Sequence, residues 1–188
     1  DRVLGVLGVA DTLRETSRQA IADLHSLGVK TLMLTGDNTH TAEAIARAVG
    51  IDEARGNLLP EDKLSTIESL LTHRKGGKVG MVGDGINDAP SLARADIGFA
   101  MGAAGTDTAI ETADVALMDD DLRKIPAFIR LSQATSDVLI QNIVVALGIK
   151  AGFLLLTVSG QATMWMAVFA DMGASLLVVA NGLRLLRR

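Results

Sequence analysis

The sequence predicts an α/β fold with a parallel sheet flanked by helices, followed by a transmembrane helical hairpin. Over the first two thirds of the chain, short apolar segments alternate with amphipathic segments that end at glycines, a pattern typical of alternating strands and helices. The last third holds two apolar runs, residues 138–158 and 162–183. Each has about the 20 residues that a helix needs to cross a bilayer. We therefore expect an α/β domain over residues 1–121 and a stalk with two membrane helices over residues 122–188.

Composition excludes several classes of protein. The net charge of −4 argues against a nucleic-acid-binding protein. The sequence has no Cys, which excludes a disulfide framework and a Cys-ligated zinc site within this segment. It opens at Asp1 with no initiator Met and no signal-peptide pattern, so we expect a piece of a longer chain.

The elements of the first part follow from local signals. Residues 3–9 form an apolar run typical of a buried strand, and Thr12 with Glu15 gives a capping-box signal for a helix that Gly28 ends. The remaining segments are predicted from their apolar patterns. Strands are expected at residues 30–34, 78–82, 97–100 and 115–117, and helices at residues 39–49 and 64–71.

Polar, glycine-containing loops follow two of the predicted strands. Thr35-Gly36-Asp37 follows the strand at residues 30–34, and Gly83-Asp84-Gly85 follows the strand at residues 78–82. In open parallel sheets, sites form at the carboxyl ends of the strands. We therefore expect both loops at one edge of the sheet.

The second loop carries two acids, Asp84 and Asp88, four residues apart. Two carboxylates so close would repel each other unless a cation lay between them, and Mg²⁺ binds one or two carboxylates together with phosphate oxygens. Asn87 can donate to a phosphate oxygen, Thr35 can do so from the other loop, and Lys63 can bring a positive charge. The simpler alternative is a turn in which an Asp caps a helix.

The two apolar runs predict a hairpin whose ends both lie in the cytoplasm, because basic residues flank the runs and the turn between them has no Lys or Arg. The flanking residues are Arg123, Lys124 and Arg130 on one side and Arg184, Arg187 and Arg188 on the other. A buried helical hairpin in a soluble core is the alternative.

Each run carries one ionisable residue near its middle, Lys150 in the first and Asp171 in the second. A charge at a helix centre costs about 2.5–3.5 kcal/mol on insertion scales, so such residues are usually functional. We expect Asp171 to coordinate a divalent cation and Lys150 to act as a counter-charge when the site is empty, with a purely structural pair as the alternative. Asn142 and Asn181 are expected to form hydrogen bonds between the helices.

Three motifs, LTGDN, PEDK and MVGDGINDAPSLARADIGFAMG, resemble the phosphorylation domain of a P-type ATPase, which has a haloacid-dehalogenase-like (Rossmann-like) fold. The resemblance implies that several residues surround an aspartyl phosphate and its Mg²⁺. These are Thr35 with Gly36 and Asp37 of its loop, Lys63, Asp84, Asn87 and Asp88. Asp84 would be the main Mg²⁺ ligand with Asp88 and Asn87 supporting it, Thr35 and Lys63 would stabilise charge on the phosphoryl group, and Asp37 would lie where an actuator domain docks.

Asn142 and Lys150, followed by Asp171-Met172-Gly173, resemble the zinc/cadmium/lead-exporting class of heavy-metal P-type ATPases. The copper class uses a Tyr in its last helices, and this sequence has no Tyr. The cobalt-like class has a His–Glu signature in its last helix, whereas the three His here all precede residue 74. The resemblance implies ATP as energy source, Zn²⁺, Cd²⁺ or Pb²⁺ as cargo, and the bacterial plasma membrane as location.

The sequence departs from that family by lacking the nucleophilic Asp of the Asp-Lys-Thr-Gly-Thr motif and the nucleotide-binding domain, so we expect these in the missing N-terminal part of the same pump. This segment alone should then be inactive. Two alternatives stay open: a membrane-anchored phosphatase of the same fold, although the surroundings of Asp11 lack the rest of a nucleophile motif, and a non-catalytic truncated paralogue.

Overall fold

The computed structural model describes residues 13–74, 76–83, 86–102 and 107–187. The strand expected at residues 3–9 and the capping residue Thr12 lie outside this part. The described residues form two compact units, one up to Pro126 and one from Ala127 on. The functional division expected between residues 121 and 122 stays a prediction.

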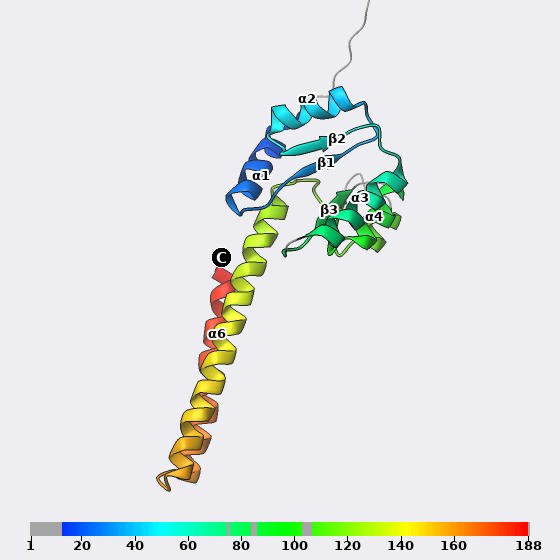
Figure 1. Cartoon of the computed structure of the whole chain (residues 1–188). Coiled ribbons are helices and arrows are strands. Elements are labelled where there is room, and N and C mark those ends of the chain that lie inside the picture. The colour runs from blue at the N-terminus through cyan, green and yellow to red at the C-terminus, as the bar shows by residue number, and fades with distance from the viewer. Residues whose placement is uncertain (1–12, 75, 84–85, 103–106, 188) are drawn as a thin grey trace, which may run out of the picture. The chain divides into compact units, whose positions relative to one another are not determined.

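The first unit alternates strands with helices, and every strand pair in it is parallel (Figure 1). Strand β1 pairs with β2, and β3, β4 and β5 pair in that order. The helices are α1 (Glu15–Ser26), α2 (Thr39–Val49), α3 (Pro60–His73), α4 (Ala89–Arg94) and α5 (Asp107–Thr112), with a short 3-10 helix η1 (Ile86–Asp88). The strands are β1 (Leu32–Leu34), β2 (Glu53–Arg55), β3 (Gly80–Gly83), β4 (Ile97–Met101) and β5 (Val115–Leu117).

Helix α2 has the bounds that the sequence predicts. Its first turn is capped by Asn38, whose side chain accepts a hydrogen bond of 2.8 Å from the backbone N–H of Thr41. Gly50 ends the helix in the left-handed conformation with φ of 92°, which Gly adopts readily. By contrast, the sequence does not predict β2 or α5. Strand β2 has only three residues, two of them charged, and shows no apolar run.

A small hydrophobic core forms around the sheet of β3, β4 and β5. Ile67 of α3, Met81 of β3, Leu92 of α4 and Ala100 of β4 pack together in it, and Leu34 of β1 packs against them. This packing brings the first turn of α3 and the carboxyl end of β3 into one region.

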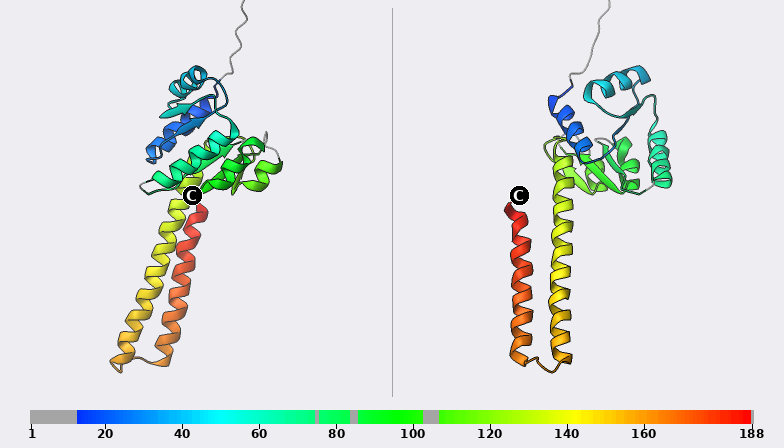
Figure 2. Two further views of the ribbon diagram at one scale, coloured as in Figure 1. Left: turned by 45° about the vertical axis from the view of Figure 1, so that its right-hand side comes forward. Right: turned by 60° about the vertical axis from the view of Figure 1, so that its left-hand side comes forward.

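The second unit is a helical hairpin. Helix α6 (Lys124–Val158) and helix α7 (Met164–Leu183) run antiparallel side by side, and a short 3-10 helix η2 (Arg184–Arg187) follows (Figure 2). Gly160, with φ of 75°, lies in the predicted polar turn between them. Both helices are long and apolar enough to cross a membrane.

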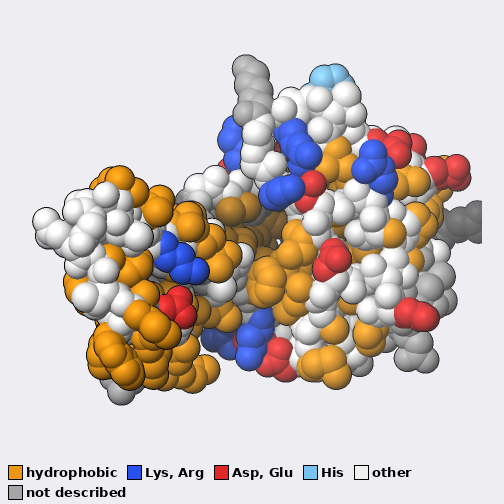
Figure 3. Space-filling view, turned by 90° about the horizontal axis from the view of Figure 1, so that it is seen from below, with side chains coloured by type: hydrophobic (Ala, Val, Ile, Leu, Met, Phe, Trp, Pro, Cys, Tyr) orange, Lys and Arg blue, Asp and Glu red, His pale blue; other side chains and the backbone are white. Residues whose placement is uncertain are grey.

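The hairpin is not buried by the rest of the described residues. In the most apolar 18-residue window of each helix, the buried share is 0% for the first helix and 6% for the second. Many large hydrophobic side chains of both helices are exposed, among them Leu155, Val158, Phe169 and Leu176, and Figure 3 shows many hydrophobic side chains on the one face of the molecule that it draws. Such extensive apolar exposure favours lipid as the surrounding medium, as the sequence indicates.

Asp96 ties β4 to β3 through its carboxylate. Its Oδ2 accepts a hydrogen bond of 2.8 Å from the backbone N–H of Val79 and forms an ion pair with Arg74, and its Oδ1 lies 3.7 Å from Nζ of Lys78. The Val79 N–H, and then the charges of Arg74 and Lys78, lower the pKa of Asp96 from its ordinary value of 3.8. This carboxylate therefore stabilises the folded first unit when it is ionised.

We expect the stability of the first unit to fall as the pH drops below about 4, partly through Asp96. The lowered pKa means that the unfolded state binds the proton more readily, so the stabilisation is complete above the unfolded pKa and is lost as the pH falls through the folded pKa. Denaturant unfolding of the chain between pH 7 and pH 2 measures this dependence. Asp96→Asn should flatten it, whereas Glu43→Gln on the exposed face of α2 should not, and an equal effect of both would contradict the assignment.

Candidate functional site

The best-defined feature of the first unit is an ion pair between Lys63 and Asp88. Nζ of Lys63 lies 2.8 Å from Oδ1 of Asp88, and the two side chains are only 17% and 12% exposed. Lys63 lies in the first turn of α3, and Asp88 is the N-cap residue of α4. The sequence predicts both residues at one phosphate site, and the structure joins them directly.

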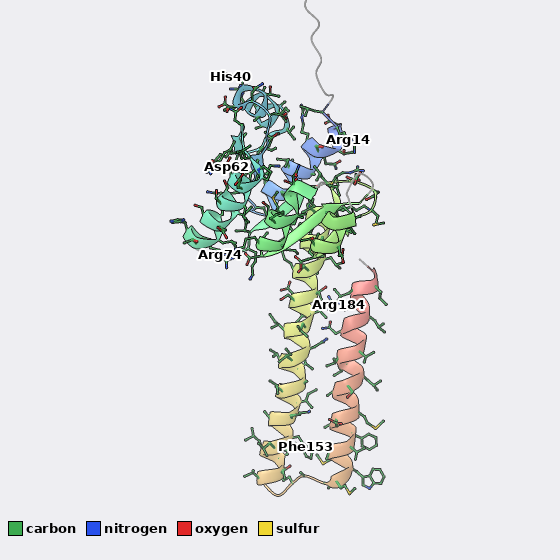
Figure 4. All side chains as sticks on the ribbon, turned by 90° about the vertical axis from the view of Figure 1, so that its right-hand side faces the viewer. Arg14, His40, Asp62, Arg74, Phe153 and Arg184 are labelled. Carbon is green, nitrogen blue, oxygen red and sulfur yellow. The ribbon has the colours of Figure 1, made fainter. Side chains whose placement is uncertain are left out.

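The entry into α3 places Lys63. The backbone N–H of Leu58 donates to the carbonyl of Thr35 at 3.1 Å, which fixes the segment after β2 to the end of β1. The carboxylate of Asp62, labelled in Figure 4, then accepts a hydrogen bond of 2.9 Å from the N–H of Leu59, the N-cap residue, as the third residue of a capping box does. Pro60 at the first helical position suits this helix start. The backbone of one predicted site residue, Thr35, thus anchors the segment that carries another.

Gly83, at the end of β3, lies directly against Asp88. A Cβ at this position would be 2.7 Å from Cβ of Asp88 and 3.1 Å from its Oδ2, so any side chain here would push the carboxylate away. Oδ1 of Asp88 accepts a hydrogen bond from Lys63, and the Asp88 side chain makes no capping hydrogen bond to α4 among the described residues. Carboxylate oxygens are ligands that a hard cation such as Mg²⁺ prefers. The other predicted ligand, Asp84, lies outside the described residues.

The loop after β1 is held by a turn that the sequence analysis missed. Oγ1 of Thr35 donates to Oδ2 of Asp37 and accepts from the N–H of Asp37, both at 3.1 Å. From the turn after β2, Asn57 donates through its backbone N–H to the carbonyl of Asp37 at 2.6 Å and through its side chain to Thr39 at 3.0 Å. A Cβ on Gly56 would lie 2.7 Å from that same carbonyl. The Gly-Asn pair, a common turn signal, could have predicted the turn but not its contact with Asp37.

The remaining predicted residues after β1 and β3 are accessible, but their side chains are not bonded to the Lys63–Asp88 pair. Gly36, Asp37 and Asn87 are exposed, and Thr35 is half-buried. In the part of the chain that the structure describes, none of these side chains forms a hydrogen bond with Lys63 or Asp88. Their roles towards a phosphoryl group stay predictions.

A cavity of about 330 Å³ lies between α6 and α7, and both Lys150 and Asp171 line it. The two side chains form no direct ion pair in the described hairpin. The described residues also contain no group of three or more His, Cys, Asp or Glu side chains that could hold a metal ion. The role of Asp171 as one ligand of a partial cation site stays a prediction.

The hydrogen bonds predicted between the membrane helices are confirmed. Nδ2 of Asn181 donates to Oδ1 of Asn142 at 2.9 Å and to Oε1 of Gln141 at 3.3 Å. Arg184, labelled at the end of α7 in Figure 4, donates to Oδ1 of Asn181 at 2.8 Å. All four side chains thus form one polar network near the basic end of the hairpin.

Comparison with known proteins matches this combination of an α/β unit and an apolar hairpin. The chain is 54% identical, over 98% of its length, to the probable cadmium-transporting ATPase of Staphylococcus aureus. It is 50% identical, over its whole length, to the zinc/cadmium/lead-transporting P-type ATPase of Escherichia coli (strain K12). It spans only 23% and 25% of the length of these two relatives.

Solved structures agree with the sequence relatives. A crystal structure of a zinc-transporting PIB-type ATPase in the E2.Pi state superimposes on 94% of this chain with a TM-score of 0.86 and 50% sequence identity, and the match covers 28% of that protein. The predicted fold and the predicted resemblance to the zinc/cadmium/lead class are both confirmed.

The family model for haloacid dehalogenase-like hydrolases matches residues 1–96, a range that includes both Lys63 and Asp88. This match and the parallel α/β architecture show that the chain belongs to the haloacid dehalogenase-like hydrolases.

Proposed function

We propose that this chain forms part of an ATP-driven exporter of zinc, cadmium or lead that works through an aspartyl phosphate. One observation carries the proposal: the chain joins a buried Lys63–Asp88 pair at a strand end to an apolar hairpin in which Lys150 and Asp171 line one cavity. A phosphatase needs only the first feature, and the relatives, whose names describe metal-transporting ATPases, favour the exporter over a phosphatase or an inactive paralogue.

The predicted site residues at the strand ends act on a phosphoryl group by positioning and charge. Lys63 holds the Asp88 carboxylate and places an ammonium group at the strand end, where it can stabilise negative charge on phosphoryl oxygens. Thr35 and Asn87 add hydrogen-bond donors. Asp84 and Asp88 would hold Mg²⁺, which would supply positive charge to stabilise a phosphoryl group.

Two open strand edges support a partner segment from the missing N-terminal part of the same pump. In the described residues, β1 pairs only with β2, and β3 pairs only with β4, so each strand leaves one edge unpaired. A further parallel strand bound to both edges would place its carboxyl end between Thr35 and Gly83. We propose that this strand carries the nucleophilic Asp, and that ATP binds in a domain outside this chain.

The hairpin would cross the bacterial plasma membrane with both ends in the cytoplasm. Support comes from the basic residues at both ends and from the turn at residues 159–163, which has no charged residue. Asp171 would contribute one oxygen ligand to the exported divalent cation, with Lys150 as counter-charge when the site is empty. Softer ligands, which zinc-group metals prefer, would come from other helices.

In the intact pump, Lys63→Ala should lower the rate of phosphoenzyme formation from ATP by roughly 10²–10³-fold, the usual loss when one preorganised charge or donor is removed. Asp88→Asn should act in the same direction because it also breaks the ion pair. Radiolabelled acyl phosphate at limiting Mg²⁺ measures both effects. Lys30→Ala, which removes an exposed lysine before β1, serves as control. Normal phosphoenzyme formation in Lys63→Ala would rule out its proposed role.

Asp171→Ala should abolish zinc- and cadmium-stimulated ATP hydrolysis by the intact pump in lipid while the protein still folds and inserts. The reason is that the mutation removes the one carboxylate of the hairpin cavity. Ser175→Ala, one turn further along α7, should leave the activity near that of the wild type. Unchanged zinc dependence in Asp171→Ala would refute the ion-site assignment.

Trp165, the single Trp of the sequence, reports on membrane insertion. It is 73% exposed in the first turn of α7, beside the polar turn, and Trp favours the membrane–water interface. In vesicles we expect blue-shifted Trp emission that lipids brominated near the headgroup quench more strongly than lipids brominated at the chain end. Trp165→Phe gives the background. Quenching by aqueous acrylamide as efficient as in the urea-unfolded chain would exclude insertion.

A further inference from the structure

Asn181 of α7 donates hydrogen bonds to Gln141 and Asn142 of α6, and Arg184 at the end of α7 donates to Oδ1 of the same Asn181. This polar network lies far along the chain from the turn at residues 159–163, so α6 and α7 are joined covalently at one end and by the network at the other. Lys150 and Asp171 lie between these two connections. We call the four residues the amide clasp.

The clasp puts Lys150 and Asp171 at one depth in the membrane. Lys150 is eight residues beyond Asn142, which is about 12 Å along α6, and Asp171 is ten residues before Asn181, about 15 Å along α7. Because the helices are antiparallel, both displacements point towards the turn. The two ionisable residues therefore differ in depth by about 3 Å, less than one helical turn.

The clasp also puts them on one side of the hairpin. At about 100° per residue, Lys150 is rotated by about 80° from the direction in which Asn142 faces α7. Asp171 is rotated by about 80° from the direction in which Asn181 faces α6, and in the antiparallel partner this rotation leads to the same flank. The result agrees with the single cavity that both residues line and with their exposure in the hairpin.

The same geometry accounts for the packing between the helices. Ile149 and Ala174 each lie seven residues from the clasp, at about 10 Å, and both face the partner helix. Ala174 is only 5% exposed, and both residues line the cavity. A slip of one residue would rotate a helix by about 100° and move Lys150 and Asp171 to different sides.

We propose that Asn181 is a positioning residue: through its amide it fixes the register of α7 on α6, so that Asp171 and Lys150 present one flank to the transported cation. That this flank binds the transported cation rests on the proposed function. The register of the two helices does not depend on ATP hydrolysis. Arg184 contributes by orienting the Asn181 amide so that its NH₂ group faces α6.

Cysteine cross-linking tests the register, and the absence of Cys from the sequence means that only introduced thiols react. The chain is placed in phosphatidylcholine–phosphatidylglycerol vesicles with one of two pairs. Ile149→Cys with Ala174→Cys reports the observed register, and Ile149→Cys with Ala170→Cys reports a slip of one turn. A short bis-maleimide gives the ratio of slipped to observed cross-links.

Asn181→Leu should raise this ratio about three- to fifteen-fold, the range expected from measured interhelical hydrogen bonds in membranes. Asn181→Gln, which keeps the amide, should restore a low ratio, and Ser175→Ala, which loses only a bond within α7, should not change it. If Asn181→Leu does not insert, as judged by Trp165 emission, Asn142→Leu makes the same comparison from α6.

An unchanged ratio in an inserted leucine variant would overturn the proposal, and so would equal ratios in Asn181→Leu and Asn181→Gln, because the amide would then not be responsible. Neither result depends on whether Asp171→Ala affects ATP hydrolysis. Failure of the register and failure of the proposed transport function are therefore separable.

Discussion

A nearly buried ion pair, Lys63 with Asp88, is the constraint on which the first unit depends. Removing two charges from water is unfavourable, and their attraction offsets that penalty only when the geometry is good. Here the pair is close at 2.8 Å, and it joins the start of α3 to the cap of α4. The surrounding backbone serves this arrangement, because Gly83 lets β3 touch the carboxylate and the carbonyl of Thr35 anchors the segment that leads to Lys63. A largely buried ion pair adds little net stability, and under the proposed function these charges act on a bound ligand.

The hairpin also carries charged side chains in surroundings that solvate them poorly. Lys150 and Asp171 are unfavourable in lipid, and the described structure leaves them on one cavity without a direct contact. Amide side chains, which are far less unfavourable in a membrane, do the structural work of joining the helices. In the hairpin, the side chains that join the helices are thus separate from the two ionisable side chains, Lys150 and Asp171.

Sequence reasoning succeeded where a signal is local. The bounds of α2 follow from Asn38 and Gly50, and the hairpin follows from the length of its apolar runs. It failed for β2, whose three residues carry no periodic pattern, and for the Gly56-Asn57 turn, whose importance arises from a contact with Asp37 distant in sequence. The direct Lys63–Asp88 bond was beyond prediction for the same reason, since residue spacing gives neighbourhood but not which oxygen meets which nitrogen.

Among the described residues, β1 and β3 each leave one edge unpaired, which has a practical consequence for anyone handling this chain by itself. Exposed backbone N–H and C=O groups on a strand edge are templates for strands of other molecules. The chain would satisfy them most readily from a second copy, and soluble oligomers or fibrous aggregates are the foreseeable product.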